Sequence, residues 1–220
     1  MIKSHGAKKA AATQKFEKQM KKGIDISILK NSILYSEELG ICLNQKTDEE
    51  LFKWFLASIL FGARIPETIA KNTYKTFERY ALLEPGGIME AGWDFLVNPI
   101  MREGGYVRYD YKTSAKILRD CEKLMKEYNG SLNKLHAESR NSRDLENKLT
   151  QFYGVGHVTS NIFLRELRYI WEKSDPDPLP IIGEIAGECG IDLSKYSRKS
   201  IAFARIEAGL MRQRKLKQNP

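Results

Sequence analysis

One segment, Leu149-Thr-Gln-Phe-Tyr-Gly-Val-Gly-His-Val-Thr-Ser-Asn-Ile-Phe-Leu164, has the pattern of a helix end, a tight turn and a helix start. Apolar residues recur at helical spacing on both sides of the turn: Leu145, Leu149 and Phe152 before it, and Phe163, Leu167 and Ile170 after it. Between them, Gly154 and Gly156 are suited to a turn with positive φ. We therefore predict two helices joined by a short hairpin, the second beginning at about His157.

The predicted hairpin has the features of a phosphate-binding site. Its glycines leave backbone amides uncovered, and the next helix adds unpaired N–H groups and the positive end of its dipole. The residues that we expect to contact phosphates are Gly154, Val155, Gly156, His157, Thr159 and Ser160. The same pattern also fits an ordinary turn in a helical bundle, so this segment alone leaves both interpretations open.

Composition limits the class of protein. With 220 residues, of which 42% are hydrophobic and 29% charged, the chain can bury a globular core. No apolar run could span a bilayer and no signal-peptide core is present, so we expect an intracellular protein that binds no membrane. Cys42, Cys121 and Cys189 are too scattered for a disulfide framework or a metal site, and we expect no cofactor.

Positive charge is concentrated at the two ends of the chain, whose net charge is +8. Residues 1–22 contain seven lysines and one glutamate, and residues 195–220 contain eight lysines and arginines and one glutamate. The remaining residues, 23–194, therefore carry a net charge of −5. Basic ends of this kind can follow the phosphates of a nucleic acid, or they can serve only solubility.

Helical signals run through the chain, and the predicted fold class is all-α. Thr47 and Glu50 form a capping box ahead of the almost wholly apolar residues 51–61, which predicts a buried helix. Further helices are expected over 66–80 and 112–128, before Gly190, and from about Ser197, with chain breaks at Pro85-Gly86-Gly87 and Gly104-Gly105. We expect a basic segment (1–22), a helical region (23–194) and a basic C-terminal helix (195–220).

Three of these segments suggest a family. They are Leu51–Pro66, the buried helix and its following loop; Tyr111–Leu118, a tyrosine-led helix start; and Phe152–Asn161, the hairpin. In this order, and over about residues 47–192, they resemble the helix-hairpin-helix DNA glycosylase superfamily, whose best-known branch is the endonuclease III family. That family usually has a proline at the position of Tyr153. The resemblance implies a two-layer helical fold of two intertwined subdomains that binds double-stranded DNA carrying a damaged or mispaired base.

The residue after the hairpin bears on the chemistry. In bifunctional members of the superfamily, a lysine there forms a Schiff base with the sugar after the base leaves. Val158 stands at the matching position, and its apolar side chain cannot do this. The resemblance therefore implies a monofunctional enzyme, because members of that kind also lack the lysine.

A second departure concerns the catalytic aspartate. Nearly all active members have one about eighteen residues further on, where its carboxylate offsets the positive charge that develops on the sugar or activates water. Counting from Val158 without gaps reaches Pro176, which lies between Asp175 and Asp177. Asp177 fits better, because an aspartate would precede the helix whose first turn suits Pro180. Asp177 is thus the candidate catalytic residue and Asp175 the alternate, unless both are only loop and cap residues.

The same resemblance implies further contacts. A glycosylase extrudes its target base and usually fills the gap with a side chain, so Arg64 or Ile65 would be the wedge. Tyr109 and Tyr111 would stack on the flipped base, although tyrosines at a helix start also serve packing. Arg165 and Arg168 on the helix after the hairpin would add phosphate contacts. From charge alone, the basic C-terminal helix would also clamp DNA, with Arg198, Arg205, Arg212 and Lys215 as its contacts. Arg165 and Arg168 could instead pair with Glu166 and Glu172.

The leading hypothesis is a DNA repair glycosylase of base excision repair that flips a base and hydrolyses its N-glycosidic bond. The alternative is a non-catalytic DNA-binding protein of the same fold that recognises bent or lesioned DNA. A helical scaffold without a DNA role is the third. We expect a location in the cytoplasm or on the nucleoid, or in the nucleus of a eukaryote, and no obligate protein partner.

Overall fold

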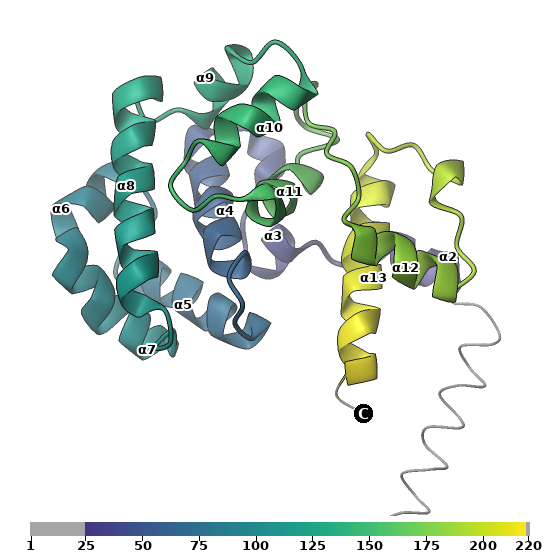
Figure 1. The fold of residues 1–220 in the computed structure, drawn as a ribbon, viewed down its shortest axis with the longest axis horizontal. Coiled ribbons are helices and arrows are strands. Elements are labelled where there is room, and N and C mark those ends of the chain that lie inside the picture. The colour runs from purple at the N-terminus through teal and green to yellow at the C-terminus, as the bar shows by residue number, and fades with distance from the viewer. Residues whose placement is uncertain (1–24, 219–220) are drawn as a thin grey trace, which may run out of the picture. The chain divides into compact units, whose positions relative to one another are not determined.

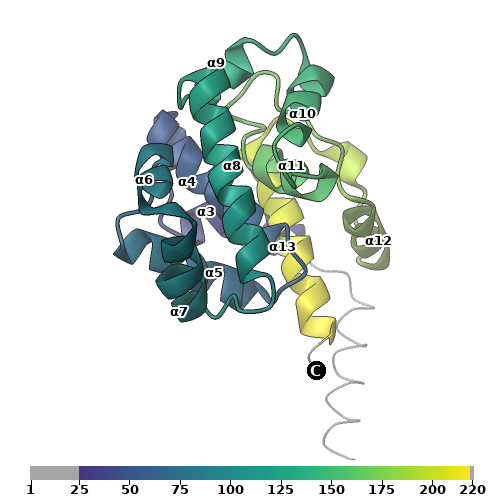
Figure 2. The same ribbon diagram turned by 60° about the vertical axis from the view of Figure 1, so that its left-hand side comes forward.

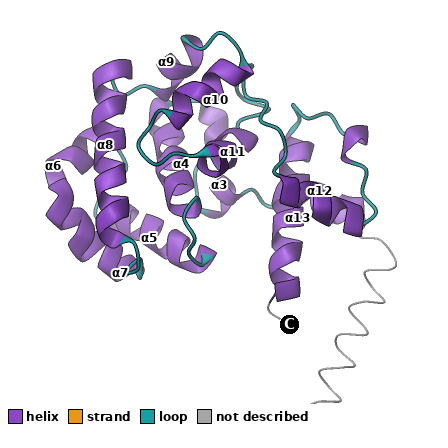
Figure 3. Ribbon diagram, in the orientation of Figure 1, coloured by secondary structure: helices purple, strands orange, loops and turns teal. Residues whose placement is uncertain are grey.

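The computed structural model describes residues 25–218, with side chains up to residue 213. No strand occurs among the described residues (Figure 3), so the predicted all-α class is confirmed. The chain divides into two compact units. The terminal unit contains the described residues up to Leu34 and those from Pro178 onward, and the central unit contains Tyr35–Asp177. The predicted basic segment 1–22 lies outside the described residues.

The terminal unit joins both ends of the described chain. Its elements are α2 (Ile26–Lys30), α12 (Pro180–Glu188), the 3₁₀ turn η3 (Leu193–Lys195) and α13 (Ile201–Gln218). Its core contains Leu29, Leu179, Ile182, Ile185, Ala186, Cys189, Ile206 and Leu210. These apolar side chains connect α12 with α2 and α13, so the division differs from the predicted one, which grouped residues 23–194. The basic helix also begins later than predicted, at Ile201.

The central unit is a contiguous helical body. In chain order its elements are α3 (Tyr35–Glu38), η1 (Leu43–Gln45), α4 (Asp48–Phe61), α5 (Glu67–Arg79), α6 (Pro85–Phe95), the π-helical turn η2 (Leu96–Met101), α7 (Arg102–Gly104), α8 (Asp110–Tyr128), α9 (Leu132–Ala137), α10 (Ser142–Thr150) and α11 (His157–Arg165). Figures 1 and 2 show α8 between α6 on one side and α10 and α11 on the other.

Helix α4 forms the centre of this unit, as predicted from its apolar sequence. All its residues from Glu50 to Leu60 except Lys53 are buried. Helix α11 packs against it, and the Trp54 indole Nε1 donates a hydrogen bond to the carbonyl of Phe163 at 3.0 Å. Because the indole N–H is satisfied there, a large aromatic ring can be buried without cost to its polar atom.

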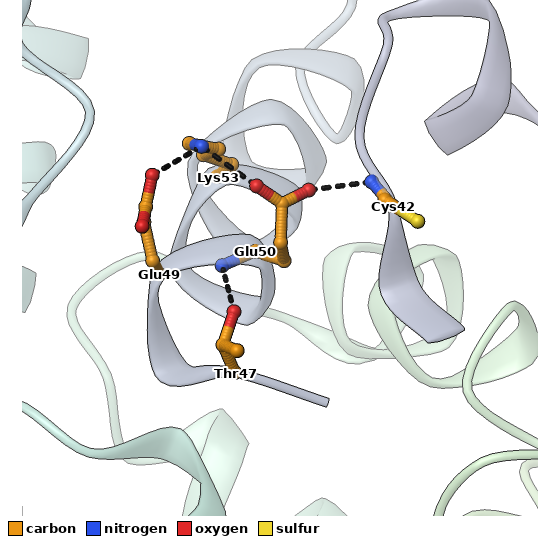
Figure 4. A network of polar contacts seen from close by, with 5 residues as sticks. All are labelled: Cys42, Thr47, Glu49, Glu50 and Lys53. Atoms are coloured by element: carbon orange, nitrogen blue, oxygen red, sulfur yellow. Dashed lines mark hydrogen bonds and ion pairs between the residues drawn. The ribbon is translucent and has the colours of Figure 1, made fainter. Parts of the chain in front are cut away.

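The start of α4 realises half of the predicted capping box (Figure 4). The Thr47 hydroxyl accepts a hydrogen bond from the Glu50 backbone N–H at 3.3 Å, as expected. The Glu50 carboxylate, however, accepts from the Cys42 backbone N–H and from Lys53 rather than reaching back to Thr47. Glu50 therefore ties the preceding turn to α4 instead of closing the reciprocal box.

The two predicted glycine breaks have different outcomes. Gly105 ends α7 in the left-handed region, with φ of +81°, as a chain break requires. Pro85-Gly86-Gly87 instead begins helix α6, with Pro85 in its first turn. Proline is favoured there because its missing N–H would have no helical acceptor. The predicted break at this position is therefore wrong, and a helix start takes its place.

Gly62 fixes the distance between α4 and α11. A Cβ atom at this position would lie 2.0 Å from the Thr159 side-chain oxygen, far inside van der Waals contact. The end of α4 and the first turn of α11 can meet only because residue 62 has no side chain. The loop that follows Gly62 is thereby held beside the hairpin.

Replacing Gly62 with alanine should therefore destabilise the fold. We expect Gly62→Ala to lower the free energy of unfolding by about 1–3 kcal/mol, because the helices must separate. Gly86→Ala is the matched control, since a Cβ at Gly86 meets nothing within 4 Å. Urea unfolding followed by circular dichroism measures both. Equal stability of the two variants would contradict the close approach.

Candidate nucleic-acid interface

A short turn joins α10 to α11 at the position where the hairpin is predicted. Phe152 and Val155 are buried and anchor the turn, and the Val155 N–H donates to the Phe152 carbonyl at 3.2 Å. Gly154 has φ of +77°, as predicted. Gly156 does not: its φ of −88° and ψ of −177° are an extended conformation that other residues adopt. Backbone geometry thus favours glycine at position 154. At position 156 the backbone would accept another residue, and the absence of a side chain there leaves the surrounding space open.

The N-terminus of α11 exposes backbone donors. Its first helical hydrogen bond runs from the Ser160 N–H to the Gly156 carbonyl at 2.9 Å, and no side chain caps it. The N–H groups of His157, Val158 and Thr159 thus have no helical acceptor. Gly156, His157 and Val158 are exposed, so an anion can reach this end of the helix.

The structure reduces the predicted set of hairpin contacts. Val155 has a buried side chain and an occupied N–H, so it serves packing. Thr159 and Ser160 have side chains that are 6% and 1% exposed, because they lie against the body of the central unit. The surface that remains accessible consists of Gly154, Gly156 and His157, together with the uncovered amides.

A carboxylate from α8 holds the hairpin in place. The Tyr153 N–H donates to Asp120 Oδ1 at 2.6 Å, and Asp120 is 1% exposed. Its other oxygen, Oδ2, is buried without a hydrogen-bond partner. Burial raises the pKa of this carboxyl to about 8, against the opposing effects of the Tyr153 N–H and of Lys116 and Lys123.

Two basic side chains beside the hairpin were missed by the sequence interpretation. The Arg119 guanidinium lies over the Tyr153 ring, 4.3 Å from its centroid. The Lys116 side chain lies against Gly154, where an added Cβ would be 2.5 Å from Lys116 Cε. A signal was available, because Lys112, Lys116, Arg119 and Lys123 recur at helical spacing.

The two candidate aspartates lie in the loop that leaves α11. Asp175 Oδ1 forms an ion pair with Arg168 Nη1 at 2.8 Å, and the Arg168 side chain is fully buried. Asp177 is exposed, and its backbone carbonyl accepts a hydrogen bond from Asn161 Nδ2 at 2.7 Å. Asn161 lies one turn after His157, so this bond fastens Asp177 to the hairpin helix. Leu179 rather than Asp177 occupies the cap position of α12.

The predicted wedge and base-stacking residues are placed differently. Arg64 is exposed and follows Gly62 by two residues, in the loop that meets the first turn of α11. Tyr111 stacks on Trp93 of α6, with ring centroids 5.5 Å apart, and lines an open pocket of about 580 Å³ with Trp93, Asp94, Val97 and Asn98. Tyr111, at the start of α8, is therefore engaged with α6. Tyr109 is half-buried under Arg108, whose guanidinium lies 5.2 Å from the ring centroid.

Arg165 and Arg168 are not phosphate contacts, contrary to prediction, because both are buried. Arg168 Nη1 forms an ion pair with Asp175. The Glu166 carboxylate accepts hydrogen bonds from the backbone N–H groups of Tyr35 and Ser36, at 2.9 and 3.0 Å, and so caps α3. These groups connect α11 with the rest of the central unit.

The predicted clamp on the C-terminal helix belongs to the terminal unit. Arg205 donates to the Ser32 carbonyl at 2.7 Å and Arg212 to the Ile33 carbonyl at 2.6 Å. Both arginines thus satisfy backbone groups after α2. Arg198 is half-buried before α13, and the Lys215 side chain lies outside the described residues.

No family model, curated protein or solved structure matches this chain. Among the described residues, no helix is long and apolar enough to cross a membrane. The same residues contain no group of three or more His, Cys, Asp or Glu side chains that could hold a metal ion.

The buried Asp120 predicts a pH-dependent stability. Its pKa is raised from 3.8 to about 8, so the folded state keeps a proton that the unfolded state releases. Relative to Asp120→Asn, the free energy of unfolding of the wild type should fall as pH rises from 3.8 to about 8. Asparagine preserves the acceptor for Tyr153. Urea unfolding at pH values of about 5, 6.5 and 8 measures the difference, and parallel curves would contradict the shift.

Proposed function

We propose that this chain is a monofunctional DNA glycosylase of the helix-hairpin-helix superfamily. It would bind duplex DNA that contains a damaged or mispaired base, flip that base, and hydrolyse its N-glycosidic bond. One observation carries the proposal: Asn161 bonds to the backbone carbonyl of Asp177 and lies on the same helix whose N-terminus exposes the hairpin amides. The backbone of an exposed aspartate is thereby tied to the first turns of the helix that would bind a phosphate.

The division of the chain supports the resemblance to this superfamily. The resemblance implied two intertwined helical subdomains, and the terminal unit combines residues from both ends of the described chain. Residues far apart in sequence, such as Leu29 and Ile206, share its core. Asp177 is the last residue of the central unit, so the proposed catalytic residue lies where the chain passes between the units.

The proposed chemistry assigns a role to each part. The amides of Gly156, His157 and Val158 would bind backbone phosphates and hold the strand. The Asp177 carboxylate would offset the positive charge on the sugar as the bond to the base breaks, while water attacks the anomeric carbon. The departing base takes up one proton and the sugar keeps the hydroxyl. Val158 is exposed and apolar, which supports hydrolysis without a Schiff base.

Base flipping needs a side chain that occupies the gap. Arg64 is the stronger of the two predicted wedges, because it is exposed in a loop that contacts the first turn of α11. Ile65, by contrast, is half-buried. Tyr109 remains a proposed stacking residue, whereas Tyr111 is engaged with Trp93. A protein with this function would act on the nucleoid, or in the nucleus of a eukaryote.

A second candidate function is recognition of bent or lesioned DNA without catalysis. The environments of the two candidate aspartates favour this second function. Asp175 is held in an ion pair with Arg168, and Asp177 is exposed. Neither is a desolvated carboxylate of the kind that many hydrolytic sites use. The same hairpin would then serve binding alone.

The hairpin predicts a selective effect of Gly156→Ala on binding. A Cβ at Gly156 meets nothing within 4 Å and its φ is compatible with alanine, so stability should be kept. Affinity for duplex DNA should fall by about tenfold, because a methyl group would keep a phosphate from the amides. Fluorescence anisotropy with a labelled duplex measures this, with Gly86→Ala as the control. Unchanged affinity would argue against amide binding of phosphate.

Catalysis is tested by base release from oligonucleotides that each carry one lesion: uracil, thymine opposite guanine, 8-oxoguanine or an alkylated purine. Strand cleavage that appears only after alkali identifies a monofunctional glycosylase and its substrate class. Asp177→Asn should bind DNA as the wild type does but lose at least about 100-fold in base release, because an amide cannot act as base or anion. Asp175→Asn should retain release. If no lesion is released while DNA binding persists, the second candidate replaces the first.

A further inference from the structure

The surface next to the hairpin carries positive charge that the proposed site does not yet use. On α8, Lys112, Lys116 and Arg119 follow one another at helical spacing. None of the three forms an ion pair with another described residue. Lys123, the next in the row, differs because it is paired with Glu127 at 2.6 Å. The row from Lys112 to Arg119 therefore carries positive charge that no ion pair with a described residue offsets.

Contacts between α8 and the hairpin hold these cations in position. Lys116 lies along the Gly154 backbone, and Arg119 lies 4.3 Å from the Tyr153 ring centroid. The exposed fraction of Tyr153 is 52%, so the pair is open to solvent on one side. A guanidinium stacked on an aromatic face keeps its N–H donors free at the edge, where a phosphate can accept from them.

The bond from Tyr153 to Asp120 makes this arrangement specific to the present chain. The helix-hairpin-helix family that the sequence resembles usually has proline at this position, and proline has no N–H to donate. Here the Tyr153 N–H reaches Asp120 Oδ1 at 2.6 Å and fastens the hairpin to α8. Tyrosine in place of proline thus adds both a bond to α8 and a platform for Arg119.

Asp120 does not cancel the positive charge of its neighbours. It accepts the hydrogen bond from the Tyr153 N–H beside these cations, and it is 1% exposed. Burial raises its pKa to about 8, so near neutral pH the carboxyl is mostly protonated. Lys116 then keeps its full charge for an external anion. The glutamates of this helix, Glu122 and Glu127, are exposed elsewhere along it.

We infer that Lys116 and Arg119 of α8 extend the hairpin into a continuous binding surface for the phosphates of one DNA strand. The amides of α11 would take one phosphate, and the two side chains would take its neighbours on the α8 side. Lys112 continues the surface toward the start of α8. This inference rests on the proposed binding of duplex DNA, but not on base removal.

The slope of log Kd against log salt concentration tests the inference. A lesion-free labelled duplex is titrated in about 50–300 mM salt, so that the result does not depend on catalysis. Lys116→Gln and Arg119→Gln should each reduce the magnitude of the slope by about 1, the loss of one phosphate contact. Lys126→Gln is the control, since Lys126 is exposed in the last turn of the same helix, seven residues beyond Arg119. Its slope should equal that of the wild type.

Lys116→Arg separates charge from packing. It keeps the positive charge, so its slope should match the wild type even if its stability differs. Thermal unfolding of each variant confirms that the protein titrated is folded. If Lys116→Gln and Arg119→Gln behave as Lys126→Gln does, the surface on α8 is refuted, while hairpin binding and base release stand. If the wild type does not bind duplex DNA even at about 50 mM salt, this inference and the proposed function both fail.

Discussion

The packing of α4 against α11 is the contact on which the rest of the central unit depends. Helix α4 is apolar on nearly every side, so it must be surrounded, and the Trp54 indole is satisfied only by the Phe163 carbonyl of α11. The absence of a side chain at Gly62 lets the two helices meet at the first turn of α11. This single close approach places the Arg64 loop beside the uncovered amides of the hairpin.

Buried polar groups then fix the chain on either side of that contact. Glu166 accepts from the start of α3, and although burial raises the pKa of its carboxyl, two backbone N–H groups and Arg165 favour the charged form. Arg168 holds Asp175, and Asn161 holds the backbone of Asp177. These two interactions therefore hold the loop that follows α11 against the segment that precedes it in the chain. Buried groups left without such partners would each cost about 1–3 kcal/mol, so the loop has little freedom.

Local sequence was a good guide where one residue decides local geometry. Helix α4, the hairpin, the ends of α7 and α8, and the proline at the start of α12 followed from apolar spacing, glycine and proline. Local sequence was a poor guide where the same residue types are compatible with two different backbone geometries. Pro85 followed by two glycines reads as a break but begins α6, and Glu50 has the spacing of a capping box yet bonds to Cys42. For Glu50 the deciding partner is Cys42, which lies eight residues before it and outside the motif.

The sequence by itself determined that the chain is helical, where its central helix lies, and that a glycine turn precedes an uncapped helix start. These properties depend on spacing and backbone propensity, which act over a few residues. Only the tertiary structure decided which charges face solvent. It buried Arg165 and Arg168, turned Arg205 to a backbone carbonyl, and brought Lys116 and Arg119 to the hairpin. The cost of burying an unpaired charge depends on neighbours that are far apart in sequence. Helical spacing could therefore mark the basic row on α8, but it could not show which element that row contacts.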